Sequence, residues 1–331
     1  MIGIALATYK PNESFLKEQI ASIKCQSWTC WVCHIVDDAS PLSTQKLISD
    51  LTDSDERFIT HFHTENLHGY QNFERALLYL KEDPRVTEIA FADQDDIWHE
   101  HKLSKLLTLL TVTGSDLIHS DLELIDTLGN RICSSVWDYE NRCPEKADTE
   151  LLLLRNTFTG CTMMFSHSLL PHILPFPKQR QIGDWYHDHW IALVASQYGK
   201  IFHAREPLVR YRQHGNNTIG AQKNTGTIRR EVTLWFDKKG HFTLKSYRIH
   251  RDLSEAFYQR FYPTADPKKI NPFSEQRLDF GFSIFKLGLR SALSGYGAQG
   301  ITLRLIINKF IYDCRRIRRL CSNHLFSQKP S

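Results

Sequence analysis

The 331-residue chain contains no stretch of about 18 uncharged apolar residues, the length that a membrane-spanning helix requires. Its N-terminal segment, residues 1–13, lacks the basic region that precedes the apolar core of a signal peptide. A large charge excess is also missing, because 41 lysines and arginines face 37 aspartates and glutamates. That surplus is too small to indicate binding of nucleic acid. These absences predict a globular, cytoplasmic protein that does not bind nucleic acid.

One of the cysteine patterns, Cys30–His34 with the sequence CWVCH, matches the signature for covalent attachment of a c-type haem. The missing export signal argues against haem, and no second close pair of Cys or His residues follows that would complete a zinc site. The segment also runs into Ile35 and Val36 and has the composition of a β-strand. We therefore expect reduced thiols, with this pair buried in the core.

Short apolar runs rich in β-branched residues alternate with helical patterns along the first half of the chain. This alternation is typical of βα units on a mostly parallel sheet and predicts an α/β fold. Strands are expected at 2–8, 31–36, 58–63 and 88–92, and helices at 15–24, 44–51 and 69–80. Farther along, we expect a helix after Lys102, a strand at 116–119, an edge hairpin at 122–130, a helix followed by a strand in 151–165, and a helix at 185–198.

Polar residues follow three of these strands at the points where the strands end. Thr8 and Tyr9 come after the first strand, Asp37 and Asp38 after the second, and Asp93 after the fourth. Open α/β sheets bind their ligands at the carboxyl ends of the strands. We therefore expect the three clusters to converge on one crevice.

The triplet Asp93-Gln94-Asp95 is the sharpest chemical signal in the sequence. Two carboxylates separated by one residue, in a tight turn after a strand, can face a hard divalent cation and a ribose hydroxyl together. This arrangement suits a nucleotide diphosphate, because the cation neutralises the phosphates while the strand end fixes their position. The alternative is that these acids are solvated turn or cap residues.

A second signal is the segment Asp37–Ser40, with the sequence DDAS, at the end of the second strand. A carboxylate at this position can accept the imide N–H of a uracil or thymine ring, and a nearby hydroxyl can bind backbone or ribose. The alternative is a helix cap or a turn.

Taken together, these segments resemble family 2 glycosyltransferases, which have the Rossmann-like GT-A fold: a mostly parallel sheet flanked by helices. The matching segments, in order, are 7–9 (ATY), 18–23 (EQIASI), 26–28 (QSW), 37–40 (DDAS), 66–69 (NLHG), 93–98 (DQDDIW), 155–156 (RN), 160–162 (GCT), 187–190 (HDHW) and 211–214 (YRQH). Within the family, the run 93–98 is similar to bacterial enzymes described as rhamnosyltransferases of surface-polysaccharide synthesis. The chain departs from the family pattern at 10–12, where Lys-Pro-Asn replaces the usual Asn-Gly.

The resemblance implies a role for each matching position. In the donor site, Asp93 approaches the ribose and Asp95 ligates Mg²⁺ or Mn²⁺. Asp188 matches the general base of the family. The expected nucleotide-binding residues at the first two strand ends are Thr8 and Tyr9, which line the pocket, and Asp37 or Asp38, which binds the base.

An inverting transfer needs a base for a chemical reason as well. The acceptor hydroxyl attacks the anomeric carbon while the nucleotide diphosphate leaves from the opposite face, so a group at the mouth of the crevice must take the hydroxyl proton. Asp188 lies between His187 and His189 at the start of a predicted helix. The helix dipole and any protonated imidazole there would favour its ionised form. Asp184 is the rival candidate, and a plain helix N-terminus is the alternative reading.

Four further residues are candidates for the site. His214 is expected to be a third metal ligand and Arg212 to pair with phosphate oxygens. Trp98 and Trp190 are candidate stacking surfaces for sugar rings, with core packing as the equal alternative.

These features lead to one functional prediction. We expect an inverting hexosyltransferase that moves a sugar, best guessed as L-rhamnose from dTDP-rhamnose, to a lipid-linked saccharide in O-antigen or capsule synthesis. A UDP-hexose donor is the near alternative. A metal-dependent phosphoesterase or nucleotidyltransferase and a non-catalytic membrane-associated scaffold are the rivals.

The C-terminal part is expected to differ from the rest. We predict a transferase domain over residues 1–220 and a helical extension over 221–331. Within the extension, 301–320 carries six basic residues and one acid, and its apolar residues recur at helical spacing. Such a basic amphipathic helix is a candidate for peripheral contact with an anionic membrane, and packing on the core with a solvated basic face is the alternative.

Overall fold

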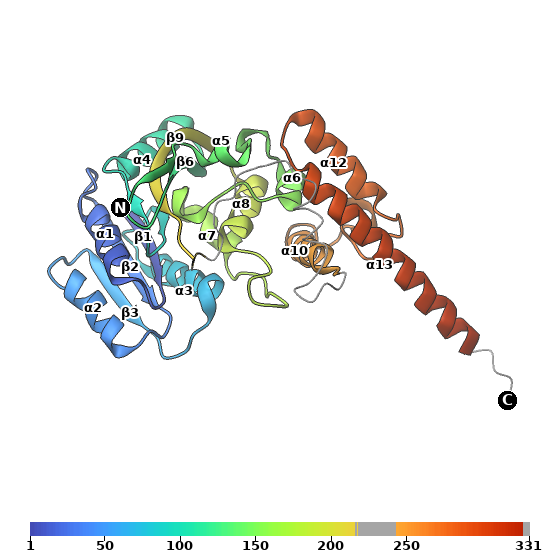
Figure 1. The fold of residues 1–331 in the computed structure, drawn as a ribbon, viewed down its shortest axis with the longest axis horizontal. Coiled ribbons are helices and arrows are strands. Elements are labelled where there is room, and N and C mark those ends of the chain that lie inside the picture. Colours follow the sequence, from blue (N-terminus) through green and yellow to red (C-terminus); the bar gives the residue numbers. More distant parts are fainter. Residues whose placement is uncertain (216, 218–242, 327–331) are drawn as a thin grey trace. The chain divides into compact units, whose positions relative to one another are not determined.

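The structure is a computed structural model that describes residues 1–215, 217 and 243–326. These residues group into two compact units. The first unit comprises the described residues within 1–145, 157–178 and 186–224, and the second those within 146–156, 179–185 and 225–331. The predicted α/β fold with a helical C-terminal part is confirmed (Figure 1). The predicted boundary after residue 220 lies outside the described residues.

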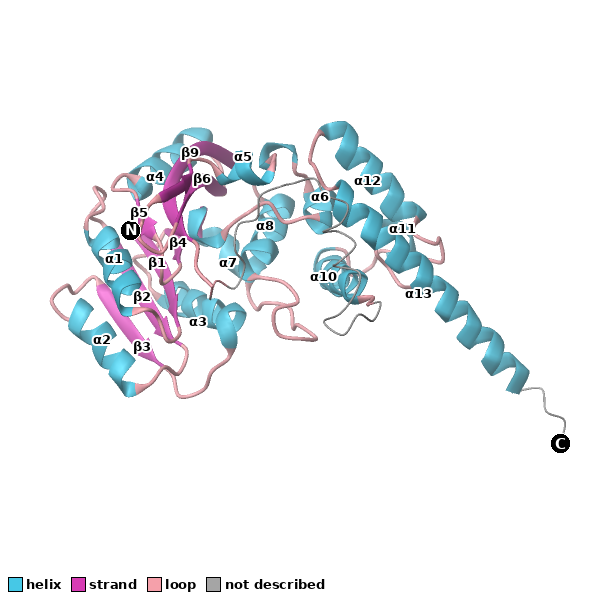
Figure 2. Cartoon of the chain, viewed as in Figure 1, coloured by secondary structure: helices cyan, strands magenta, loops and turns pink. Residues whose placement is uncertain are grey.

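The first unit is built on one nine-stranded sheet with the order β3-β2-β1-β4-β8-β6-β9-β5, and β7 pairs with β6 (Figure 2). The neighbours β3, β2, β1 and β4 are parallel, whereas β8 is antiparallel to both β4 and β6. The strands are β1 (Ile2–Thr8), β2 (Trp31–Asp37), β3 (Phe58–Phe62), β4 (Glu88–Ala92), β5 (Ile97–Trp98), β6 (Leu117–Ile125), β7 (Arg131–Cys133), β8 (Met163–Ser166) and β9 (Ile201–Arg212).

The helices of this unit connect the strands as the βα pattern predicts. Asn12 begins the first of them, because its side chain accepts hydrogen bonds from the backbone N–H groups of Ser14 and Phe15. Gly114, in the left-handed conformation with φ of 58°, ends another. The helices are α1 (Glu13–Lys24), α2 (Leu42–Thr52), α3 (His68–Glu82), α4 (Lys102–Thr113), α5 (Val136–Glu140), α7 (Leu170–Ile173) and α8 (His187–Tyr198).

One predicted pair of strands is a single strand in the structure. Residues 116–119 and 122–126 were expected as separate elements, but β6 runs without a break from Leu117 to Ile125. It pairs with β9 along its whole length, and bulges near Asp121 absorb the change of register. The predicted hairpin after it is confirmed, since Gly129 turns the chain into β7 with a φ of 83°.

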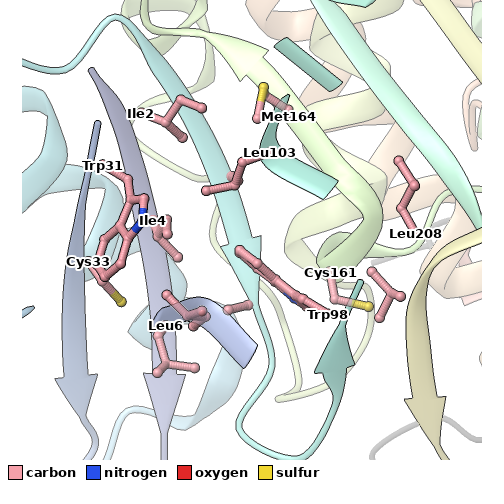
Figure 3. Close-up of a cluster of buried hydrophobic side chains, with 14 of the residues drawn as sticks. Ile2, Ile4, Leu6, Trp31, Cys33, Trp98, Leu103, Cys161, Met164 and Leu208 are labelled. Carbon is pink, nitrogen blue, oxygen red and sulfur yellow. The ribbon is translucent and has the colours of Figure 1, made fainter. Parts of the chain in front are cut away.

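The core of the first unit lies against β1. Alternate residues Ile2, Ile4 and Leu6 point to one face and belong to a buried cluster that also includes Trp31 and Cys33 of β2 (Figure 3). The other face of β1 is covered as well, so the strand reads as a continuous apolar run, as parallel strands buried on both sides do. Only half of the expected cysteine pair belongs to the core, because Cys30 is exposed.

The second unit is helical. Its longest helix, α13, contains the basic segment that the sequence singled out. No helix in the described part of the chain is both long enough and apolar enough to span a bilayer. The helices are α6 (Thr149–Leu154), α10 (Lys245–Phe261), α11 (Pro267–Ile270), α12 (Phe282–Ser294) and α13 (Gln299–Phe326).

A fully buried ion pair anchors α13. The Lys309 Nζ atom lies 2.6 Å from both carboxylate oxygens of Asp313 and donates to the backbone oxygen of Arg277 at 2.5 Å. Asp313 also accepts a hydrogen bond from the Phe280 N–H. Both charges are thus compensated locally, which a buried ion requires.

We expect Lys309→Met to destabilise the second unit by about 3–5 kcal/mol, because it leaves the Asp313 carboxylate buried without its cation. The double variant Lys309→Met with Asp313→Leu should recover part of the loss. Denaturant unfolding of the three proteins measures this, with the exposed Lys268→Met as the control. Equal stability of the single and double variants would contradict the role of the pair.

Candidate functional site

The carboxyl ends of β1, β2 and β4 lie at one edge of the sheet, since the three strands are parallel neighbours. Side chains link these ends. The Thr8 hydroxyl donates to an Asp37 carboxylate oxygen at 3.0 Å. Gln94 forms a reciprocal pair with the backbone of Tyr9, accepting from its N–H at 2.8 Å and donating to its carbonyl at 3.3 Å. Gln94, which had no predicted role, therefore connects the turn Asp93-Gln94-Asp95, here called the DxD turn, to the end of β1.

The side chains of Asp37 and Asp38 fix the backbone around the end of β2 by accepting hydrogen bonds. Both are buried, and Asp37 accepts from the Ser40 N–H as well as from Thr8. Asp38 accepts from the N–H groups of Leu67 and His68 and pairs with Arg75 at 3.1 Å. The segment NLHG is thus the partner of Asp38.

The segment 10–12, which departs from the family pattern, has an unusual backbone conformation at its first residue. Lys10 adopts a left-handed backbone with φ of 43°, a conformation that Asn and Gly reach more easily. Its N–H donates to the Ser40 hydroxyl at 2.8 Å, which compensates for the unfavourable residue type. Asn12 caps α1, so the loop still ends where the helix begins.

Acidic side chains crowd the end of β4. Burial, together with the nearby carboxylates of Asp95 and Asp188, raises the pKa of Asp93 to about 7. Burial also raises the pKa of Asp96 well above its usual range, with contributions from Asp95 and Asp93. The first unit therefore brings Asp188 of α8 into the same electrostatic site as the DxD acids.

His214 lies beside Asp95. Its Nε2 atom is 2.8 Å from a carboxylate oxygen of Asp95, and its ring is 5.5 Å from that of Phe15, centroid to centroid. The chain reaches this point through β9, which runs along β6 and pairs with β5. The two predicted metal ligands, 119 positions apart in sequence, are in direct contact.

Arg212 has a different role from the expected one. Its side chain is 1% exposed, and its Nε donates to the Asp95 carbonyl at 2.9 Å while its backbone N–H donates to Asp96 at 3.1 Å. The rest of the guanidinium donates to the carbonyls of Asp126 and Thr127 and to Glu18. The expectation that it pairs with phosphate oxygens is corrected: it fixes the backbone of the DxD turn from behind.

A buried layer beneath the acids was not predicted. Lys102 is fully buried, and its Nζ donates to the Cys161 carbonyl at 2.7 Å and lies 3.1 Å from the centre of the Trp98 ring. Burial lowers the pKa of Lys102 to about 7, and the charges of Asp96 and Asp93 act in the opposite direction. A lysine at the start of a helix gives no sequence signal for this role. Only the fold shows that it lies close enough to Asp96 and Asp93 to interact with their charges.

The two candidate stacking residues are part of the core. Trp98 is 3% exposed and belongs to the main apolar cluster (Figure 3). Trp190 is 0% exposed and donates from its indole nitrogen to the Ile173 carbonyl at 2.9 Å. Neither ring offers a face to a sugar, so core packing, the alternative reading, describes both.

Asp188 lies in the first turn of α8, where the helix dipole favours an anion. Its neighbour His187 does not supply positive charge, because burial lowers the pKa of that imidazole to about 3. His187 instead stacks on Phe73 and packs so closely against Gly160 that an added Cβ there would overlap it. The rival Asp184 belongs to the second unit, where it accepts from the Gln181 N–H and lies 3.8 Å from Arg248.

The residues at this edge fit a divalent cation. Asp95 and His214 offer a carboxylate and an imidazole in direct contact, and carboxylate oxygens suit Mg²⁺ and Mn²⁺. A cation would also relieve the repulsion that raises the pKa of Asp93. Ligand atoms of Asp93, Asp96 and Cys161 lie within 4.8 Å of one another, but Asp96 is fully buried and burial keeps the Cys161 thiol protonated by raising its pKa. The open side, with Asp95 and His214, is the better match.

The raised pKa of Asp93 has a measurable consequence. Because the folded state holds this proton up to pH of about 7 and an ordinary carboxyl releases it near 3.8, the metal-free protein should lose stability as pH rises through that interval. We expect Asp93→Asn to stabilise the metal-free protein by about 2 kcal/mol at pH 8 and far less at pH 4.5. Thermal melts in EDTA at both pH values test this, with Asp50→Asn, at an exposed position of α2, as the matched control for charge. A gain that is independent of pH would contradict it.

Comparisons with known proteins agree with this geometry. The model of glycosyl transferase family 2 matches residues 4–173, just over half of the chain. The Escherichia coli UDP-Glc:alpha-D-GlcNAc-diphosphoundecaprenol beta-1,3-glucosyltransferase WfgD is 26% identical over 187 residues, covering 56% of this chain and 68% of the relative. The Shigella flexneri dTDP-rhamnosyl transferase RfbG is 24% identical over 250 residues, covering 71% and 81%.

A solved structure has a similar fold. The match to S. aureus TarS 1-349 in complex with UDP-GlcNAc has a TM-score of 0.53 at 13% identity and covers 96% of this chain and 91% of that one. At this identity the likeness concerns the GT-A fold alone. The family match covers β1, β2 and β4 with the acids at their ends. The chain belongs to glycosyl transferase family 2 and is a glycosyltransferase.

Proposed function

We propose that this chain is an inverting, metal-dependent enzyme that transfers one sugar from a nucleotide diphosphate donor to a lipid-linked saccharide in surface-polysaccharide synthesis. The observation that carries the proposal is the shared site of Asp93, Asp95 and Asp188, in which burial and the charges of the other two acids raise the pKa of Asp93. One group of acids holds the donor, and an acid from a different element remains for the acceptor. A phosphoesterase or nucleotidyltransferase is not favoured, since the family match includes Asp93 and Asp95.

The residues divide the work between them. Asp95 and His214 would hold the cation and Asp93 would face the ribose, while Thr8, Tyr9 and the loop that Asp38 holds would form the nucleotide pocket. When bound, the cation stabilises the negative charge on the departing diphosphate, so no protein acid is needed there. Arg212 keeps the Asp95 carbonyl and the Asp96 carboxylate in place without touching the donor.

Asp188 acts as the general base. Its carboxylate accepts a hydrogen bond from the His189 N–H at 2.6 Å, and the N-terminal turn of α8 stabilises its charged form. It takes the proton of the acceptor hydroxyl as that oxygen attacks the anomeric carbon. A single displacement of this kind inverts the configuration at that carbon.

The donor is proposed as dTDP-L-rhamnose, with a UDP-hexose as the alternative. Two relatives support one sugar each: RfbG is named a dTDP-rhamnosyl transferase and WfgD a UDP-Glc-dependent glucosyltransferase. The name of WfgD also includes a diphosphoundecaprenol-linked sugar, which supports a lipid-linked acceptor.

The assigned roles of Asp95 and Asp188 predict different kinetic defects. Asp188→Asn should lower kcat by about 100-fold or more and leave donor binding intact, because a general base contributes about that much. Asp95→Ala should abolish Mn²⁺-dependent donor binding as well as transfer. Isothermal titration with the nucleotide and a transfer assay separate the two. Asp184→Asn is the control for the rival base, and loss of transfer in it alone would overturn the assignment.

The nucleotide preference can be tested without knowing the acceptor. We expect dTDP with Mn²⁺ to raise the melting temperature more than UDP, GDP or CDP, and each effect to vanish in EDTA, since a ligand stabilises the state that it binds. A larger shift with UDP would replace the rhamnose donor by a UDP-hexose. Stabilisation that persists without metal would contradict the cation site.

A further inference from the structure

The apolar stripe of α13 is not the face of this helix that packs on the rest of the second unit. In the structure the packed face is largely polar, and the side chains at 50% exposure or more on this helix include the apolar Leu303, Phe310 and Leu320. The buried residues of the helix are Thr302, Arg304, Leu305, Asn308, Lys309 and Asp313. An amphipathic helix packed on a core in water shows the opposite arrangement. The outward face of α13 therefore needs an apolar environment of its own.

The preceding helix repeats this pattern. In α12 the side chains of Phe282, Phe285, Leu289 and Leu293 are between 50% and 81% exposed and recur at helical spacing along one stripe. The buried face of α12 is formed by Ile284, Leu287, Gly288 and Ser291. Exposed apolar residues are ordinary when they are scattered, but the stripe on α12, together with Leu303 and Phe310 on the neighbouring helix, marks an interaction site.

The two helices lie side by side and antiparallel (Figure 1). A Cβ added to Gly288 would overlap Thr302, and one added to Gly281 would lie 3.1 Å from the Ile306 carbonyl oxygen. Later positions of α12 thus face earlier positions of α13. The small residues allow the two helices to approach closely.

The two stripes face the same side. Thr302 and Gly288 mark the side on which each helix contacts the other. At about 100° per residue, Leu303 and Phe310 lie about a quarter turn around α13 from Thr302, and Leu289 lies about a quarter turn around α12 from Gly288, in the same direction of rotation. A twofold rotation that exchanges the two antiparallel helices keeps this direction, so both sets of side chains project to the same side. The stripes of α12 and α13 consequently form one apolar face of the second unit, here called the α12–α13 face.

Basic side chains accompany the α12–α13 face. Residues 280–320 contain eight lysines and arginines and one acid, Asp313, which is buried against Lys309. Lys286 is exposed beside Phe282, and Arg315, Arg318 and Arg319 are exposed in the part of α13 that follows Phe310. The exposed charge of these two helices is therefore entirely positive over this segment.

We propose that the α12–α13 face docks on a bilayer surface with anionic headgroups. The apolar stripes enter the boundary between headgroups and acyl chains, and Lys286 and Arg318, the exposed basic residues nearest to the stripes around their helices, bind the anionic headgroups. A second copy of the chain is the less suitable occupant, because a symmetric contact would bring the same positive charges together. The inference does not rest on the donor or on the catalytic roles, and it explains how a lipid-linked acceptor is met at the membrane.

Sedimentation with vesicles tests the proposal. The full-length protein should bind vesicles of phosphatidylcholine with phosphatidylglycerol and bind pure phosphatidylcholine far less. Lys286→Gln with Arg318→Gln should weaken binding by about fivefold per charge removed. Phe285→Ser with Leu289→Ser should weaken it by about tenfold or more. Both pairs are exposed, so melting temperatures should not fall, whereas truncation of α13 would also remove the Lys309–Asp313 pair.

The controls separate this surface from the active site. Leu42→Ser, at an 81% exposed apolar position of α2 in the first unit, is the matched apolar control and should bind as the unchanged protein does. Nucleotide binding in solution should be the same in all variants, so failure of vesicle binding and failure of the proposed activity are distinguishable. No binding of the unchanged protein at low salt would overturn the proposal. So would a dimer in light scattering that Phe285→Ser with Leu289→Ser dissociates.

Discussion

Repulsion among carboxylates at one edge of the sheet is the constraint on which the first unit depends. Asp96 is buried and Asp93 is half-buried among neighbouring acids, and desolvation and these acids raise the pKa of both. Two buried basic residues beneath the acids offset this repulsion. Lys102 lies in the layer below Asp93 and Asp96, and Arg212 donates to the backbone of Asp95 and to the side chain of Asp96. These contacts come from α4 and β9, so the acids can be held together only when the whole sheet is assembled.

This arrangement suits a substrate that arrives with a cation. The metal-free site is too acidic for a bare diphosphate, whereas a divalent ion at Asp95 and His214 makes the edge attractive to one. The conformation of the DxD turn is fixed before any ligand enters, because Gln94 pairs with the Tyr9 backbone and Arg212 holds the Asp95 carbonyl. Such preorganisation reduces the free energy lost in ordering the site on binding.

The second unit follows a different principle. Its helices α12 and α13 bury polar groups, among them the pair of Lys309 with Asp313, and turn several apolar side chains outward. Burying an ion pair between helices is unfavourable unless its geometry is good, and leaving Phe and Leu in water adds no stability. Both features are consistent with a unit whose outer face works in a less polar medium than water.

Local patterns in the sequence determined the α/β order, the bounds of β1 and β4, the acids at the strand ends and the family, since periodicity and short motifs depend on neighbouring residues alone. The tertiary structure decided which side chains face a ligand. Arg212 and Trp190 look like ligand-binding residues in sequence but are buried, whereas Leu303 and Phe310 of the apolar stripe of α13, which looks like a packing face, are exposed. Burial depends on which surface meets a distant segment, and no local spacing contains that information.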